Sequence, residues 1–300
     1  MQTIRLGLEW FLNPDHVPFL LAEEFGWFRE AGLVVELVEP EAHLDALAEI
    51  EAGRMDVAVT EPIHLVDDRA RGDAVVGFAR FLHTNGGVMY LAGRGIERPR
   101  DMAGKRVQYP GAPGPGGPAI VRTMIEADGG DAGATLQPVN NSFYHTDALL
   151  EDKADVATLI FRNFEIVEAQ HRGHDARFFA LKDWGIPDFC QLILITTPTL
   201  LEERREAFAS LIAVIRRGID FIKERPDEAA AVYARRAGVA PDDALGAAIT
   251  AATLPCFTHD LSMSTEYYAG LQRWMHERGL IAETIDPALY WTNAHVLPSA

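Results

Sequence analysis

Apolar positions along the first part of the chain change repeatedly between strand-like and helix-like spacing. Residues 3–8 alternate and predict a strand, and residues 17–30 place apolar side chains at helical spacing. The run VVELVEP predicts a second strand, residues 43–52 a further helix and MDVAVT a third strand. This βαβαβ order predicts parallel strands joined by right-handed crossovers.

A later segment repeats part of this pattern. The repeated pattern is the end of a predicted helix, a basic residue, one spacer residue and then Asp-Val-Ala, which begins an apolar strand. It occurs in LAEIEAGRMDVAV (47–59) and in LLEDKADVAT (149–158). The corresponding residues are Arg54, Asp56 and Val57 in the first copy and Lys153, Asp155 and Val156 in the second. The distance between the copies predicts two similarly built lobes and not a short-period solenoid.

The segments between and after the copies predict where the chain changes lobe. LAGRGIERPRDMAGKRVQYPG (91–111) fits a crossing, and CQLILITTPTLL (190–201) fits a return strand, after which 202–282 are largely helical. We therefore expect a discontinuous lobe 1, residues 1–92 plus 194–300, and a lobe 2, residues 93–193. Two crossings predict a hinge and a ligand cleft between the lobes.

The amino-acid composition limits the classes of partner that this chain is expected to bind. The 300 residues carry 27 Lys plus Arg against 44 Asp plus Glu, a formal charge of −17, which disfavours nucleic acid and anionic membranes. No apolar run reaches the roughly 18 residues that a membrane helix needs. Strand-like alternation begins in the first few residues, with no export-signal pattern before it. This predicts a cytoplasmic protein, or a periplasmic or other extracytoplasmic one if an export signal precedes the given sequence.

Contact groups gather where the first and third strands end, which is where open parallel sheets bind ligands. Trp10 offers a stacking ring, Asn13 a donor and an acceptor, and His16 begins a helix. An equally good reading makes Asn13 or Asp15 a helix cap and places Trp10 in the core.

The third strand ends in VTEPIH, which supplies Thr60, Glu61 and His64. Glu61 is suited to accept hydrogen bonds from an amino-substituted ring, and His64 to bond or to carry protons. A purely structural role is the alternative for each of them.

The stretch YPGAPGPGGPA (109–119) holds Gly111, Gly114, Gly116 and Gly117 before a predicted helix, an arrangement that lets backbone amides approach an anion. Its spacing matches neither a P-loop nor GxGxxG, which disfavours an ATPase. A turn stiffened by prolines is the alternative.

Lobe 2 adds weaker candidates, of which we retain Asn163, Asp188 and Cys190. Cys190 is more often a small buried residue than a nucleophile in such a setting. No HxH or HxxxH pair anchors a metal, so we expect none, and no GxSxG signature supports a serine hydrolase. Cys190 and Cys256 form neither a disulfide framework nor a CxxC knuckle.

The N-terminal third resembles a known family. EWFLNPDHVPFLLAEEFGWFREAGLVVELVEP and EAGRMDVAVTEPIHLVDDRARG are similar to the NMT1/THI5-like family, which has the type II periplasmic-binding-protein fold. The resemblance implies an α/β protein of two lobes with mixed, mostly parallel sheets and a hinge. The family includes substrate-binding proteins of ABC importers, some specific for thiamine pyrimidine precursors, and a cytosolic pyrimidine synthase that consumes its own histidine and bound pyridoxal phosphate.

Carried over by position, the resemblance implies that Trp10 and Asn13 frame a planar heterocycle and that Glu61 lies near its polar edge. The glycine-rich turn then faces a phosphate, and His64 falls where the synthase has its donor histidine. Thr60 stands at the position of the synthase's cofactor lysine, which disfavours a Schiff base with pyridoxal phosphate, so we expect no cofactor. PDFC replaces a cysteine-rich stretch and leaves only Cys190.

Two functions follow. The preferred one is binding of a small planar heterocycle, with an ABC permease as a possible partner and no membrane insertion. The alternative is a cytosolic enzyme related to the pyrimidine synthase, in which His64 and Cys190 would be the catalytic residues.

Overall fold

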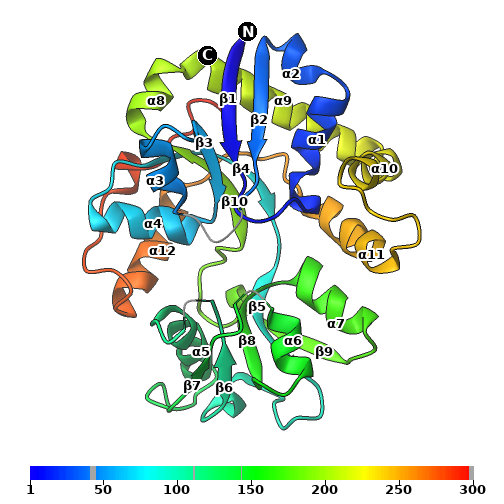
Figure 1. Cartoon of the computed structure of the whole chain (residues 1–300). Helices are drawn as coiled ribbons and strands as arrows, with labels where there is room; N and C mark the ends of the chain where they lie inside the picture. Colours follow the sequence, from blue (N-terminus) through cyan, green and yellow to red (C-terminus); the bar gives the residue numbers. More distant parts are fainter. Residues whose placement is uncertain (41–44, 111, 143, 297–300) are drawn as a thin grey trace. The chain divides into compact units, whose positions relative to one another are not determined.

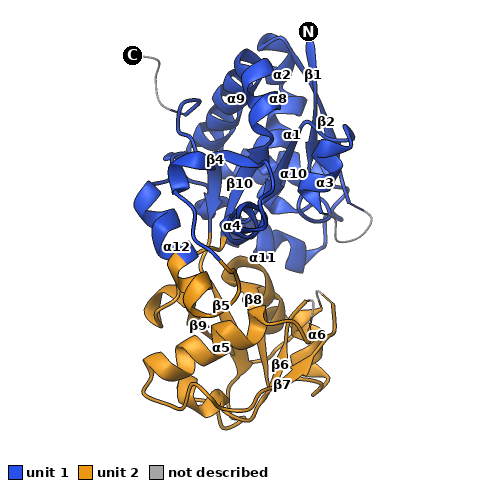
Figure 2. Ribbon diagram, turned by 90° about the vertical axis from the view of Figure 1, so that its left-hand side faces the viewer, with its two compact units in different colours: residues 1–83, 191–272, 283–300 blue, residues 84–190, 273–282 orange. Residues whose placement is uncertain are grey.

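The computed structural model describes residues 1–40, 45–110, 112–142 and 144–296. The chain divides into two compact units (Figure 2). Unit 1 comprises residues 1–83, 191–272 and 283–300, and unit 2 comprises residues 84–190 and 273–282. The first two crossings fall at 83/84 and 190/191, where we expected 92/93 and 193/194. Two further crossings, at 272/273 and 282/283, place the segment 273–282 in unit 2, although we expected it in lobe 1.

Unit 1 is built on a five-stranded sheet in the order β2-β1-β3-β10-β4 (Figure 1). The strands are β1 (Gln2–Gly7), β2 (Leu33–Val38), β3 (Val57–Thr60), β4 (Val76–His83) and β10 (Gln191–Thr196). As predicted, β1 pairs in parallel with both β2 and β3. The return strand β10 pairs antiparallel with β3 and β4, so the sheet is mixed.

Helices accompany this sheet, most of them where the periodicity predicts. The helix at 62–71 was not predicted, and the helix at 198–203 overlaps the return strand that we expected over 190–201. They are α1 (Val17–Glu24), α2 (Trp27–Glu30), α3 (Ala46–Glu51), α4 (Pro62–Arg71), α8 (Pro198–Glu203), α9 (Arg205–Glu224), α10 (Pro226–Arg236), α11 (Ala244–Thr253) and α12 (Thr265–Glu277). The helix expected over 17–30 is divided in two, because Gly26 takes a left-handed φ of 74° between α1 and α2. Residues 43 and 44 of the expected helix 43–52 lie outside the described residues.

Unit 2 repeats the same sheet plan, in the order β7-β6-β8-β5-β9. Its strands are β5 (Gly86–Leu91), β6 (Arg106–Gln108), β7 (Gln137–Val139), β8 (Val156–Phe161) and β9 (Ala176–Ala180), and its helices are α5 (Gly116–Ala127), α6 (His145–Leu150) and α7 (Val167–His171). β6 is parallel to β7 and β8, whereas β5 is antiparallel to β8 and β9. The prediction of two similarly built lobes is confirmed at the level of strand order.

The aspartate of each repeated Asp-Val-Ala stretch pairs with an arginine in the same way in both units, and we call this pairing the Arg–Asp clasp. In unit 1, Asp56 accepts from the backbone N, Nε and Nη2 of Arg5 at 2.7–3.1 Å. In unit 2, Asp155 accepts from the same three atoms of Arg106 at 2.8–3.1 Å. Each aspartate precedes the third parallel strand of its unit, so the clasp ties that strand to its neighbour.

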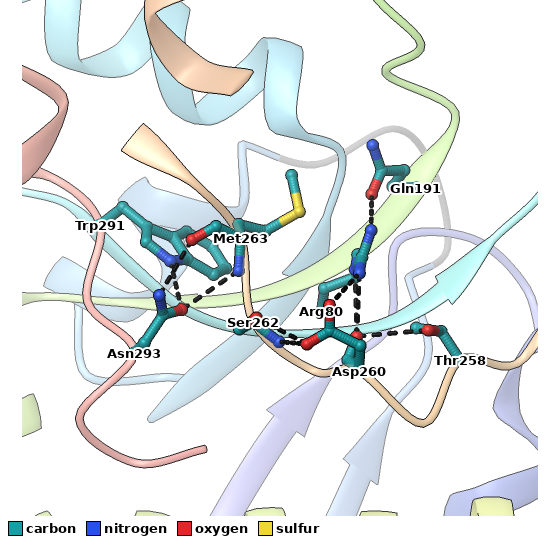
Figure 3. A network of polar contacts seen from close by, with 8 residues as sticks. All are labelled: Arg80, Gln191, Thr258, Asp260, Ser262, Met263, Trp291 and Asn293. Carbon is teal, nitrogen blue, oxygen red and sulfur yellow. Dashed lines mark hydrogen bonds and ion pairs between the residues drawn. The ribbon is translucent and has the colours of Figure 1, made fainter. Parts of the chain in front are cut away.

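The outer edge of β4 is covered by two later segments of the chain. The backbone amide of Arg80 donates to Leu261 O at 2.8 Å, and that of Gly77 donates to Tyr290 O at 2.9 Å. Figure 3 shows the side chains that join these segments: the Arg80 guanidinium bonds Asp260 and Gln191, and Asn293 bonds Met263 and Trp291. An edge strand covered in this way does not offer its backbone groups to another chain.

Among the helices of the described segments, none is both long and apolar enough to cross a membrane.

Candidate functional site

Within each unit, the loops that follow two neighbouring parallel strands lie at the same edge of the sheet. In unit 1, Leu6 and Gly7 of β1 lie opposite Val57 and Ala58 of β3, so the loop 8–16 and the turn 60–64 leave side by side. In unit 2, β6 and β8 have the corresponding register, and the glycine-rich turn and the turn 162–166 follow them. Within each unit, the expected candidates in these loops therefore share one edge.

Asn13 organises the loop after β1. Its Oδ1 accepts from Asp15 N at 2.8 Å, its Nδ2 donates to Phe11 O at 2.9 Å, and its side chain is almost fully buried. It caps the 3-10 turn Pro14–His16, which confirms the alternative reading of this residue as a helix cap. A direct ligand contact by Asn13 stays a prediction, and the burial does not favour it.

His16 is fully buried and also bonded within the loop. Its Nδ1 accepts from Asn13 N at 3.2 Å, and its Nε2 lies 3.0–3.1 Å from the two carboxylate oxygens of Glu9. Burial alone would lower the pKa of His16, but the charge and hydrogen bond of Glu9 outweigh it and raise the pKa. A ring held on both nitrogens does not reach a ligand unless the loop opens.

Two other residues of this loop are accessible. Trp10 is half-buried and Phe11 is 45% exposed, and their ring centroids lie 4.1 Å apart. Glu9 is partly exposed at 19% of its side chain, and we did not predict it from the sequence. The sequence feature that could have indicated Glu9 is its place directly before Trp10 and seven residues before His16.

The turn after β3 brings Thr60 and His64 together. Thr60 is buried at the end of the strand, and its Oγ1 lies 3.1 Å from His64 Nδ1. His64 is exposed on the first turn of α4, and Glu61 is half-buried at the N-cap of the same helix. Unit 1 therefore presents an aromatic ring, carboxylates and an imidazole at one sheet edge.

The glycine-rich turn of unit 2 is packed around Tyr109. The Tyr109 hydroxyl donates to Gly114 O at 2.7 Å, and a Cβ at Gly117 would lie 2.4 Å from the Tyr109 ring. Gly117 is thus needed for packing, whereas a Cβ at Gly116 would meet nothing within 4 Å. Gly111 lies outside the described residues. Gly116 opens α5, so the turn does precede a helix as expected.

The turn after β8 is a short π-helix, Arg162–Ile166, that buries two polar side chains. Thr84 Oγ1 donates to Asn163 Oδ1 at 2.7 Å. Glu165 accepts from Phe161 N at 2.9 Å, and burial raises the pKa of its carboxyl to about 7. Turns of this type occur frequently at functional sites.

The remaining candidates lie just before the return crossing. Asp188 is half-buried, and Cys190 is fully buried, where a Cβ at Gly86 would lie 1.7 Å from its sulfur. Cys190 therefore packs against Gly86 of β5, in keeping with a structural role. Over the described residues, no three His, Cys, Asp or Glu side chains are grouped so that they could hold a metal ion.

Sequence comparisons agree on one family. The family model described as NMT1/THI5 like matches residues 13–229. A formylaminopyrimidine-binding protein of Halalkalibacterium halodurans is 30% identical over 230 residues, which are 76% of this chain and 69% of the relative. A 4-amino-5-hydroxymethyl-2-methylpyrimidine phosphate synthase of Legionella pneumophila is 27% identical over 296 residues, 97% of this chain and 91% of the relative.

Solved structures agree on the fold. The periplasmic aliphatic sulphonate binding protein SsuA of Escherichia coli superposes with a TM-score of 0.76 over 97% of this chain and 92% of its own, at 15% identity. The expected fold class, a two-lobed α/β protein of the periplasmic-binding-protein type, is confirmed.

Proposed function

Because the chain belongs to the NMT1/THI5-like family, we propose that it binds a small planar heterocycle of the thiamine-type pyrimidine precursor class. The relative from Halalkalibacterium halodurans, which is named for binding formylaminopyrimidine, supports this ligand class. The ligand would be held by stacking and by a few directed hydrogen bonds, as in pockets for small molecules.

The observation that carries the proposal is the shared edge after β1 and β3. Trp10, Glu61 and His64 lie in two turns that leave the sheet side by side, and all three side chains are partly or fully accessible. The indole supplies a stacking surface. The carboxylate and the imidazole supply acceptors and donors for the ring's polar edge.

Other residues have supporting roles in this proposal. Asn13 and His16 would shape the loop from inside, because their polar atoms are bonded within it. Thr60 holds His64 by the hydrogen bond at 3.1 Å. We also propose the glycine-rich turn, Asn163 and Asp188 of unit 2 as ligand contacts. The importer branch of the family suggests two further proposals, a permease as partner and an extracytoplasmic location.

Isothermal titration calorimetry with formylaminopyrimidine and with 4-amino-5-hydroxymethyl-2-methylpyrimidine tests the proposal. We expect saturable binding. Trp10→Ala should weaken it by roughly 1–3 kcal/mol because the stacking surface is lost, and it should leave the fold intact because Trp10 lies in a loop and not in the core. The matched control is Phe25→Ala, which also removes a partly exposed ring that stacks on a neighbour, Trp27, at the other end of α1. Equal affinity of Trp10→Ala and the native protein would remove Trp10 from the site.

A catalytic function is the second candidate, favoured by the match to the Legionella synthase over 97% of the chain. His64 would then be the reacting side chain, and buried Cys190 is less well placed for that role. Pyridoxal phosphate fits the site incompletely, since Thr60 has no amine to bond its aldehyde. Incubation with pyridoxal phosphate is therefore expected to give at most a complex without Schiff-base absorbance, and pyrimidine formation with loss of His64 would support the enzyme instead.

A further inference from the structure

The loop after β1 contains a continuous hydrogen-bonded chain from its backbone to an accessible carboxylate. Asn13 N contacts His16 Nδ1 at 3.2 Å, and His16 Nε2 contacts both oxygens of Glu9 at 3.0 and 3.1 Å. Asn13 and His16 are buried, with 1% and 0% exposure, whereas the Glu9 side chain is 19% exposed. The chain therefore leads from the interior of the loop to its surface.

The geometry fixes the position of the imidazole proton. A backbone amide is always a donor, so His16 Nδ1, which receives the Asn13 N–H, must be an acceptor. A neutral ring with an acceptor at Nδ1 carries its proton on Nε2. His16 Nε2–H then donates to the carboxylate of Glu9, whose oxygens accept hydrogen bonds and donate none in the ionised form.

This contact orients the carboxylate without saturating it. An ionised carboxylate offers about four lone-pair positions, and the single Nε2–H of His16 occupies only part of them. Glu9 immediately precedes Trp10, so an aromatic ring and a fixed carboxylate are adjacent in the same loop. A planar ligand that stacks on the indole would need a hydrogen-bond donor on its rim to meet this carboxylate.

We propose that Glu9 is a specificity-determining residue that accepts a hydrogen bond from an exocyclic amino group of the ligand, and that His16 is a positioning residue that acts only through Glu9. The inference rests on the proposed function and names the feature of the ligand that the site selects. It also accounts for a histidine at a strand exit that is fully buried and yet bonded to an accessible side chain.

The experiment compares two ligands by calorimetry on the native chain and three variants of the site, together with a double variant and a control variant. The ligands are 4-amino-5-hydroxymethyl-2-methylpyrimidine and the same ring without the amino group. The proteins are the native chain, Glu9→Met, His16→Phe and His16→Gln. Phe keeps a ring beside Phe19, whose centroid lies 6.4 Å from that of His16, but cannot hydrogen-bond. Gln can accept from Asn13 N through its oxygen and donate to Glu9 through its nitrogen.

We expect the native protein to prefer the amino-bearing ring about tenfold to a hundredfold, the range of a hydrogen bond to a charged group. Glu9→Met and His16→Phe should both reduce this preference to near unity, and their double variant should lose no more than either alone. His16→Gln should restore most of the preference, which a purely space-filling role of His16 would not predict. His171→Phe, on the exposed end of α7, is the matched histidine control and should behave as native.

The outcomes separate this proposal from the function on which it rests. If the native protein binds both rings with equal affinity, or if His16→Phe keeps the preference, the positioning proposal is overturned and the binding function stands. If neither ring binds, both are overturned. Should His16→Phe fail to fold, Glu9→Met and His16→Gln still decide the matter. At a pH above the raised pKa of His16, ¹⁵N NMR of the native imidazole must also show a protonated Nε2 and an unprotonated Nδ1.

Discussion

Glu165 is a buried carboxyl whose protonation changes near neutral pH. It accepts the backbone N–H of Phe161, and burial raises its pKa to about 7 from an ordinary value of 4.5. A carboxyl with a raised folded-state pKa stabilises the fold fully below its unfolded pKa, and this contribution is lost as pH rises through the folded pKa. Between pH 4.5 and 7, Glu165 therefore favours the folded protein increasingly as the solution becomes more acid.

Glu165→Gln should remove this dependence, since an amide oxygen can still accept the Phe161 N–H and does not titrate. Relative to the native protein, the variant should gain up to about 3 kcal/mol at pH 8 and almost nothing at pH 4.5, from 1.36 kcal/mol per pKa unit. Urea denaturation at both pH values measures the difference. Glu266→Gln, exposed at the start of α12, is the control and should leave the pH dependence unchanged.

At the scale of single residues, the sequence predicted positions better than roles. Trp10 and His64 lie accessible at the predicted strand exits. Asn13 and His16 lie there too, but their polar atoms serve the loop itself. Residue type cannot separate these roles, because a cap and a ligand contact need the same oxygen, and only the turn geometry decides which partner is nearer.

Among the elements, the Arg–Asp clasp holds the central parallel strands together at matching places in both sheets. Asp56 lies between Arg5 and Arg204, whose Nη1 is 2.9 Å from its Oδ1. Burial would raise the pKa of Asp56, but the hydrogen bonds from Arg5 outweigh it and lower the pKa. The carboxylate therefore stays charged, and its loss would leave two guanidinium groups without this partner.

Asp56→Ala should destabilise unit 1 by about 2 kcal/mol, within the range of hydrogen bonds to a charged group, because Asp56 is buried but the Arg5 side chain is partly exposed. Asp155→Ala removes the equivalent clasp of unit 2 and is the matched variant. Hydrogen exchange should show faster amide exchange in β1 and β3 for the first variant, and in β6 and β8 for the second. Faster exchange spread evenly over both sheets in either variant would contradict a local role for the clasp.

Not every element with a sequence signal was predicted. The segment VVGFARFLHTNGGVMYL contains β4 and β5, which we did not predict, although its polar HTNGG stretch separates two apolar runs. The π-helix after β8 has no sequence signal at all, since its extra residue per turn depends on how Asn163 and Glu165 are buried.

For the whole molecule, the presence of two similarly built units was predictable from one short echo, but the exact division of the chain was not. Helical periodicity in STEYYAGLQRWMHERGL predicts α12 without indicating which core it joins. In the structure, Trp274 donates from Nε1 to Thr123 Oγ1 at 3.1 Å and stacks on Phe189, so the last turn of α12 belongs to unit 2. Such a contact between distant residues is visible only after folding.

The cover on β4 has a consequence for shortened forms of this protein. Gly77 exchanges backbone hydrogen bonds with Tyr290 and Thr292, and the Trp291 ring lies where a Cβ on Gly77 would be. Removing residues 290–300 would uncover the first half of that strand, and two truncated molecules could then pair strand to strand. Analytical ultracentrifugation should find dimers or larger species of the truncated chain at concentrations where the full chain sediments unchanged, whereas equal sedimentation of both would mean that the rest of the edge is sufficiently protected.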